Sequence, residues 1–157
     1  MDPEIEHLRQ GFPIWITLPI QWGDQDAFRH VNNTVYLRWF ESARIAYGSR
    51  IDLAESGDGK KIAPILAAIA CNYRRQLTFP DTVHVGSRIT RMGRSSFTME
   101  HRVISEAQRA IAAEGDSTLV AFDYVAQKPV PLSDDLRAQI HQLEGKSLTG
   151  TSEGVAP

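Results

Sequence analysis

Residues 22–44 read WGDQDAFRHVNNTVYLRWFESAR, and this stretch decides the fold. Its first half is polar, with Asp24, Asp26 and His30 followed by the pair Asn32-Asn33. Its second half is apolar and aromatic. A change of this kind predicts a polar loop that leads directly into a helix.

The apolar half has the spacing of a helix rather than of a strand. Apolar residues recur at helical intervals at Tyr36, Phe40, Ala43 and Tyr47. Further apolar residues lie on the other sides, so we expect a helix over 34–51 that is buried nearly all round. Asn32 or Asn33 suits the N-cap, because an amide oxygen can accept from the free N–H groups of the first turn.

The remainder of the chain has the pattern of strands. One strand precedes the helix and about four follow it, within 14–20, 62–79, 83–89, 97–103 and 119–126. Pro19 favours an edge position or a strand end, and Ser133 suits the cap of a C-terminal helix that reaches about Leu143. This order predicts an α+β architecture in which an antiparallel sheet wraps around one long helix.

Composition limits the class of protein. The 157 residues fit one domain over 1–147 with a flexible tail over 148–157. A net charge of −2 gives no reason to expect nucleic acid as a partner. The single cysteine, Cys71, allows no internal disulfide. The first residues lack the order of a signal peptide, and the longest apolar stretch, 62–71, is too short to cross a bilayer. We therefore expect a cytoplasmic protein with no membrane partner.

Residues 26–41 resemble the motif of hotdog-fold thioesterases of the 4-hydroxybenzoyl-CoA and acyl-CoA thioesterase branch. The His-Val-Asn-Asn core, residues 30–33, is also similar to acyl-ACP thioesterases. The resemblance implies a hotdog fold and hydrolysis of an acyl-CoA, or of an acyl-carrier-protein thioester, to a free acid. It also implies homodimers or homotetramers formed through sheet edges, with active sites at the subunit boundary, and no cofactor apart from the CoA of the substrate.

Within this resemblance, the catalytic carboxylate is Asp26 and the backbone N–H of Asn33 helps to hold the carbonyl oxygen. The chemistry agrees, since the first N–H groups of a helix have no intrahelical partner and lie at the positive end of its dipole. A thioester carbonyl placed there would be polarised. Asp26 could act as a nucleophile or activate a water molecule. Asp24 is interpreted as a turn-forming residue.

Two positions depart from the family pattern. Phe28 occupies a position where acyl-ACP enzymes carry Asn, and Arg29 precedes His30 where the CoA branch often has Gly. Gly tolerates backbone angles that Arg does not. His30 is therefore a catalytic candidate whose alternative is a hydrogen-bonded loop residue. Glu41 is the reserve catalytic candidate in a partly buried setting, with an ion pair along the helix as its alternative.

The densest basic region contains Arg74, Arg75, Arg88, Arg91 and Arg94. Because Arg suits phosphate geometry, we expect Arg75, Arg88 and Arg94 to contact the phosphates of CoA, unless they are solvated arginines at a strand edge. The histidines lack ligand-like spacing and no cysteine pair exists, so no metal site is predicted.

Specificity stays open at this point. The acyl pocket would depend on how the aromatic side chains converge: Trp15, Tyr36, Trp39, Tyr73 and Phe97. Two other functions fit the same motif. The spacing of Asp26 and His30 allows a hotdog hydratase or dehydratase that acts on enoyl or 3-hydroxyacyl thioesters, and a non-catalytic acyl-CoA-binding module is the second alternative.

Overall fold

The computed structural model describes residues 1–57, 59–146 and 148. Apart from Leu148, the tail predicted over 148–157 lies outside these described residues. Within them, seven strands form one antiparallel sheet in the order β1-β4-β5-β6-β3-β2, with β7 paired to β6. The strands are β1 (Ile14–Pro19), β2 (Glu55–Gly57), β3 (Lys60–Tyr73), β4 (Thr82–Met92), β5 (Ser96–Ser105), β6 (Ala110–Asp123) and β7 (Lys128–Pro129).

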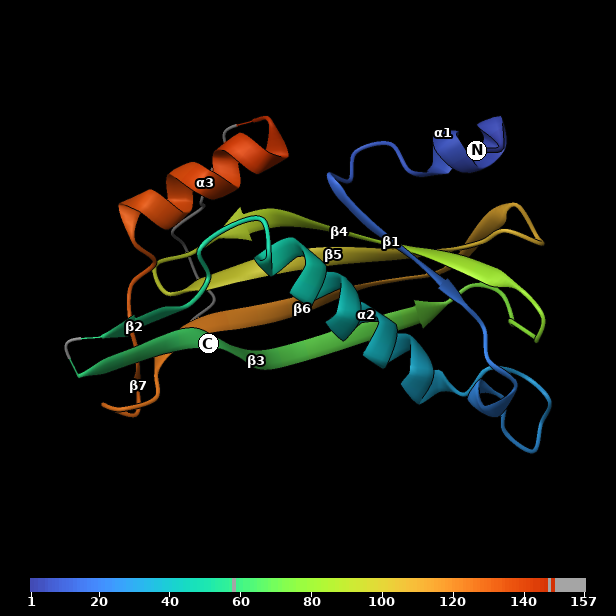
Figure 1. Cartoon of the computed structure of the whole chain (residues 1–157), viewed down its shortest axis with the longest axis horizontal. Coiled ribbons are helices and arrows are strands. Elements are labelled where there is room, and N and C mark those ends of the chain that lie inside the picture. Colours follow the sequence, from blue (N-terminus) through green and yellow to red (C-terminus); the bar gives the residue numbers. More distant parts are fainter. Residues whose placement is uncertain (58, 147, 149–157) are drawn as a thin grey trace.

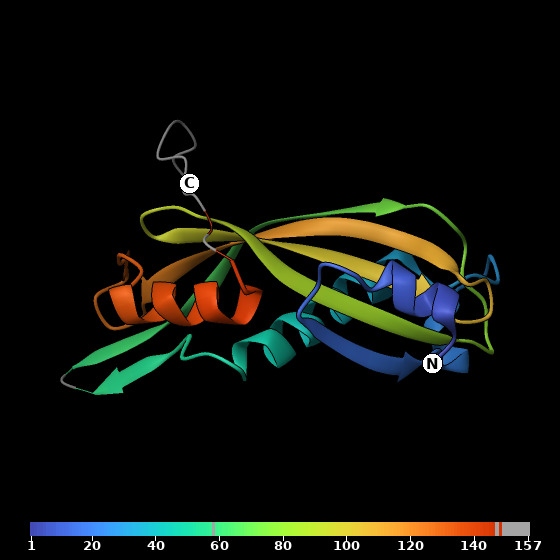
Figure 2. The same cartoon turned by 90° about the horizontal axis from the view of Figure 1, so that it is seen from above.

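The long helix α2 (Asn33–Gly48) runs along one face of the curved sheet (Figures 1 and 2). Two shorter helices, α1 (Pro3–Leu8) and α3 (Asp134–Glu144), lie near opposite ends of the molecule. None of the described helices is long and apolar enough to cross a membrane. The arrangement confirms the predicted α+β hotdog fold.

The burial of α2 is less complete than the sequence predicted. Its buried residues are Tyr36, Trp39, Phe40, Ala43 and Tyr47. The opposite side remains exposed in the single chain, with Arg38 and Glu41 at the surface and Ile45 67% exposed. The prediction of a helix buried nearly all round was therefore wrong, because apolar residues occur on a side that the chain's own sheet does not cover.

The core has two halves along α2. The first half of the helix packs against Val83, Val85 and Val103 of the sheet. The second half, with Tyr47, packs against a cluster that includes Ile140 of α3. Helix α3 begins at the Ser133 cap, as predicted, where the side chain accepts from the N–H of Leu136. The C-terminal helix thus closes the half of the core that is farther from the start of α2.

Glu144, at the end of α3, connects three elements. Its Oε1 accepts a 2.7 Å hydrogen bond from the Tyr47 hydroxyl and another of 2.7 Å from the backbone N–H of Ile89. The register of β4 shifts between Ile89 and Arg91, which marks a bulge next to that N–H. The carboxylate therefore satisfies a buried hydroxyl and a strand N–H at the same place.

A network of hydrogen-bonded polar side chains crosses the sheet beneath α2. His101 is 1% exposed, stacks on Phe40 with ring centroids 4.6 Å apart, and uses both ring nitrogens. Nδ1 lies 2.7 Å from the Ser87 hydroxyl and Nε2 lies 2.8 Å from the Ser117 hydroxyl, which also accepts from Arg44 of α2. Burial, and next the charge of Arg44, lowers the pKa of His101 from 6.5 to about 3. The imidazole is therefore neutral at physiological pH.

The outer edge of β3 is exposed and apolar. Within the described residues, β2 pairs only with the start of β3, at Lys60–Ile62, so the rest of this edge has no partner strand. Ile65 is 39% exposed and Leu66 is 43% exposed, and the alanines beside them are exposed as well. A long apolar edge of this kind is a template for pairing with another strand.

Candidate functional site

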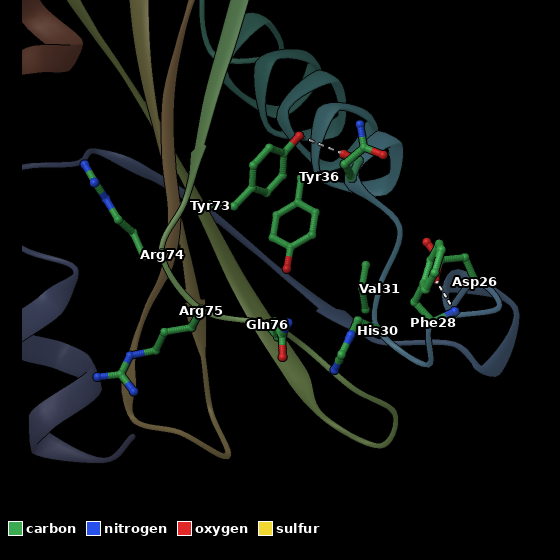
Figure 3. A pocket seen from close by; sticks show the side chains of 10 residues that line it. Asp26, Phe28, His30, Val31, Tyr36, Tyr73, Arg74, Arg75 and Gln76 are labelled. Carbon is green, nitrogen blue, oxygen red and sulfur yellow. Dashed lines mark hydrogen bonds between the residues drawn. The ribbon is translucent and has the colours of Figure 1, made fainter.

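A pocket of about 300 Å³ opens where the polar loop meets the start of α2. Figure 3 shows its lining, which comes from the loop, the first turn of α2 and the end of β3. The residues that line it are Asp26, Phe28, His30, Val31, Asn33, Tyr36, Tyr73, Arg74, Arg75 and Gln76. All three predicted catalytic residues, Asp26, His30 and Asn33, therefore lie around the same pocket.

Two hydrogen bonds fix the carboxylate of Asp26. Oδ1 accepts from the backbone N–H of Phe28 at 2.9 Å, and Oδ2 accepts from the side-chain amide of Asn32 at 3.0 Å. The loop closes behind it, since the Asp26 N–H donates to the His30 carbonyl at 3.1 Å. The carboxylate is half-buried and faces the pocket in a defined orientation.

Asp24 has the structural role that the sequence predicted. Its Oδ2 accepts from the backbone N–H of Gln21 at 2.8 Å, and its carbonyl accepts from the N–H of Asn32 at 2.9 Å. These bonds stabilise the short 3₁₀ turn η1 (Trp22–Asp24) and tie it to the residue before α2. Asp24 does not line the pocket.

Arg29 adopts a left-handed backbone conformation, with φ of 66°. This is the position where the resembled thioesterases often carry Gly. An L-residue with a side chain adopts this region at a cost of about 1–2 kcal/mol, whereas Gly adopts it freely. The loop thus keeps a shape that suits glycine although the residue is arginine.

The start of α2 has a backbone N–H without an acceptor, at a residue that lines the pocket. Asn32 is the N-cap, and its Oδ1 accepts from the N–H of Thr34 at 2.9 Å. The Asn32 carbonyl accepts from the N–H of Val35 at 3.0 Å. Among the described residues, the N–H of Asn33 has no hydrogen-bond acceptor. It is therefore available to a ligand at the positive end of the helix dipole.

Two tyrosines form the wall opposite the loop. The Tyr73 hydroxyl donates to the carbonyl of Asn33 at 3.1 Å, which ties the end of β3 to the start of α2. The Tyr36 ring packs edge-to-face on Tyr73, with centroids 5.0 Å apart. Burial raises the pKa of Tyr36 to about 12, with smaller contributions from Cys71 and Tyr73. Tyr36 is therefore a protonated hydroxyl at any physiological pH.

Of the three predicted phosphate-binding arginines, only Arg75 lies at the pocket. It is exposed, and its guanidinium has no ion-pair partner among the described residues. Arg88 donates from Nε to Glu100 at 2.9 Å and from Nη1 to the Gly11 carbonyl at 3.3 Å. Arg94 lies in the turn between β4 and β5, where its carbonyl accepts from the N–H of Leu132. Neither lines the pocket.

The reserve candidate Glu41 lies outside the pocket. It is exposed on α2, so the partly buried setting that we expected for it is wrong for the single chain. Of the aromatic residues expected around an acyl group, Tyr36 and Tyr73 line the pocket. The described residues contain no group of three or more His, Cys, Asp or Glu side chains that could hold a metal ion.

Sequence reasoning missed Gln76. It lies in the segment after β3, and its carbonyl accepts from the Gln108 side chain at 2.8 Å while its own side chain faces the pocket (Figure 3). No motif surrounds Gln76 in the sequence. It reaches the pocket that Asp26 lines only because β3 ends beside the loop. A local pattern could not have identified it.

Comparison with known proteins gives a consistent result. A family model described as the thioesterase-like superfamily matches residues 20–140. The long-chain acyl-CoA thioesterase FadM of Escherichia coli is 27% identical over 118 residues, which is 75% of this chain and 89% of FadM. A thioesterase from Thermus thermophilus, crystallised with coenzyme A and zinc, is 34% identical with a TM-score of 0.75, covering 87% of this chain and 98% of that one.

A third similarity concerns the fold alone. A thioesterase-superfamily protein from a Jannaschia species superposes with a TM-score of 0.77 at 23% identity, covering 86% of this chain and 85% of that one. The sheet and central helix described above are therefore shared with solved structures across a wide range of sequence.

Proposed function

Because this chain belongs to the thioesterase-like superfamily and is a thioester hydrolase, we propose that its substrates are acyl-CoA thioesters, which it cleaves to a free acid and CoA. The acyl-CoA activity of FadM and the coenzyme A in the Thermus protein support this class of substrate. An acyl-carrier-protein thioester presents the same reacting bond. We propose no further cofactor and no metal, and a cytoplasmic location in keeping with the single cysteine.

One observation carries the proposal: Asp26 lines the same pocket as Asn33, whose backbone N–H has no acceptor among the described residues. A thioester oxygen that accepts from this N–H would be stabilised as it becomes an oxyanion. Loss of one comparable donor typically lowers the rate by about 10²-fold to 10³-fold. The carbonyl carbon would then lie within reach of Asp26.

Two routes remain open for Asp26. As a nucleophile, one of its oxygens bonds to the carbonyl carbon, the C–S bond breaks, CoA leaves as the thiolate, and water cleaves the resulting mixed anhydride. As a general base, Asp26 removes a proton from a water molecule while the water oxygen bonds to the same carbon. In either route the hydrogen bonds from Phe28 and Asn32 hold the carboxylate in position.

His30 and Arg75 are the candidates for contacts with the rest of the substrate. His30 lines the pocket beside Asp26, so we propose that it contacts the acyl or pantetheine portion. Arg75 is exposed at the rim and suits a phosphate of CoA. Arg88, which is bonded to Glu100, is not proposed for this role.

We also propose that the active form is a homodimer, or a tetramer built from dimers, formed through the exposed edge of β3. Strand pairing there would cover the exposed side chains of Ile65 and Leu66 and satisfy the free backbone groups of the edge. Because β3 ends at Tyr73, which lines the pocket, a second copy would lie next to the site.

The test is thiol release from a panel of acyl-CoAs by the unaltered protein and by Asp26→Asn. We expect Asp26→Asn to lower kcat by about 10²-fold to 10⁴-fold. Asp24→Asn is the matched control, since Asp24 lies in the same loop but outside the pocket, and it should keep most of the activity. An Asp26→Asn protein as active as Asp24→Asn would refute the assignment.

The same panel separates the two other functions that the motif allows. Crotonyl-CoA that loses its enoyl absorbance without releasing thiol would indicate hydration. Tight binding of acyl-CoAs without turnover of any of them would indicate a binding module.

A further inference from the structure

Tyr36 lies in the first turns of α2 with its ring enclosed by other aromatic side chains. The residue is 3% exposed, and its ring centroid lies 5.2 Å from that of Trp39 and 5.0 Å from that of Tyr73. These contacts restrict the orientation of the ring. Figure 3 shows its hydroxyl pointing into the pocket, toward the side formed by Val31, His30 and Gln76.

The hydroxyl of Tyr36 differs from those of the neighbouring tyrosines. Tyr73 donates to the carbonyl of Asn33, and Tyr47 donates to Glu144. Within the described residues, the Tyr36 hydroxyl makes no hydrogen bond, and it is not among the fully enclosed polar atoms, so it is open to the pocket. A buried ring that carries a free hydroxyl into a pocket is a donor placed for a ligand.

The position of this donor limits which part of the ligand it meets. Tyr36 lies three residues after Asn33, so the two residues share a face of the helix. Helix side chains tilt toward the N-terminus, which brings the hydroxyl back toward the level of the Asn33 N–H. If the thioester carbonyl lies at that N–H, as in the proposed function on which this inference rests, the acceptor for Tyr36 lies a few bonds away in the acyl group.

We propose that Tyr36 is a specificity-determining residue, and that the pocket prefers acyl groups with an oxygen on the third carbon, such as 3-oxoacyl groups, over saturated acyl groups of the same length. The oxygen of such a group accepts from the Tyr36 hydroxyl while the thioester oxygen accepts from the Asn33 N–H. A saturated chain displaces water from the hydroxyl and offers no acceptor in return.

The size of the preference follows from that unpaired donor. Leaving one buried polar group without a partner lowers binding by about tenfold to a hundredfold. Because burial raises the pKa of Tyr36 to about 12, the hydroxyl stays protonated and the preference should not change between pH 6 and 7, a range that lies below this value and below the pH at which a 3-oxoacyl thioester itself ionises. An imidazole in the same role would titrate in this range.

The experiment measures kcat/KM for 3-oxoacyl-CoA and saturated acyl-CoA pairs of equal length, with the unaltered protein, Tyr36→Phe and Tyr47→Phe. A 3-oxo group makes the thioester intrinsically more reactive, so the quantity compared is the change of the ratio between proteins. We expect Tyr36→Phe to reduce the ratio about tenfold or more, because the 3-oxoacyl substrate loses its donor and the saturated substrate no longer buries an unpaired hydroxyl. Tyr47→Phe removes a buried hydroxyl on the same helix, away from the pocket, and should leave the ratio unchanged.

A second measurement needs no variant. Non-hydrolysable thioethers, S-(3-oxoalkyl)-CoA and S-alkyl-CoA, are titrated calorimetrically into the unaltered protein, and we expect the former to bind about tenfold more tightly. Equal affinities, or a Tyr36→Phe protein in which both substrates are affected alike, would overturn the proposal. If either result is found while acyl-CoAs still release thiol, the proposed function holds and only the role of Tyr36 is refuted. If no acyl-CoA releases thiol, the proposed function itself is refuted.

Discussion

Arg29 shows how a single residue can depart from a motif without changing the loop. Its φ of 66° is the conformation that glycine would supply, and the hydrogen bonds around it are formed: its own N–H donates to the carbonyl of Asp26, and the N–H of Asp26 donates to His30. The backbone geometry at the catalytic candidate is thus held by the surrounding contacts, and Arg29 bears the strain.

We therefore expect Arg29→Gly to be more stable than Arg29→Ala by about 1 kcal/mol in the free energy of unfolding. Both variants lose the arginine side chain, but only glycine relieves the left-handed conformation. Urea denaturation of the two variants measures the difference. Equal midpoints would mean that the loop does not hold residue 29 at positive φ in solution.

At the same scale, the sequence predicted the local part of the site and missed the distant part. Asp26, His30 and Asn33 lie within eight positions of one another, so a motif could group them, and they line one pocket. Gln76 reaches the same pocket from the segment after β3, a strand near the opposite edge of the sheet from β1. Its arrival depends on where β3 ends relative to the loop, which is a tertiary property without a local signal.

Among the elements, the sequence predicted those with strong periodicity or caps. Helix α2 begins at an Asn cap and α3 at Ser133, and Pro19 ends an edge strand as expected. The short elements α1, β2 and β7 were missed, since a few residues carry too little periodicity to identify them. The bulge in β4 was missed as well. It interrupts the alternation of side chains along β4 between Ile89 and Arg91.

The hydrogen-bond network around His101, which joins three strands to α2, makes the free energy of unfolding depend on pH. His101 is neutral in the folded chain, with a pKa of about 3, and its ordinary value is 6.5. Below pH 6.5 the unfolded chain binds a proton that the folded chain does not. The contribution of His101 to stability is therefore complete above pH 6.5 and is lost progressively as the pH falls toward 3.

We expect the unaltered protein to lose about 2 kcal/mol more unfolding free energy than His101→Gln between pH 7 and pH 5. Glutamine can bond to the hydroxyls of Ser87 and Ser117 but does not titrate. Chemical denaturation of both proteins at the two pH values gives the comparison, in which other titrating groups contribute equally. Parallel losses in the two proteins would contradict a neutral buried imidazole.

At the scale of the whole molecule, the exposed edge of β3 is the apolar surface that a single chain leaves uncovered. We expect Leu66→Lys to shift the protein from dimer to monomer, because a charge on an apolar edge opposes strand pairing. Light scattering coupled to size-exclusion chromatography measures the mass. Val125→Lys is the control, since Val125 is 62% exposed but lies in the turn after β6. An unaltered protein that elutes as a monomer would contradict the proposed assembly.

The bond between Glu144 and the Ile89 N–H offers a reporter of motion across the molecule. This amide is protected by a carboxylate of the C-terminal helix rather than by a neighbouring strand. Its hydrogen–deuterium exchange rate therefore measures how often α3 detaches, while the amides of β5 beside it follow global unfolding. A single backbone resonance could thus distinguish partial opening of the far half of the core from loss of the entire fold.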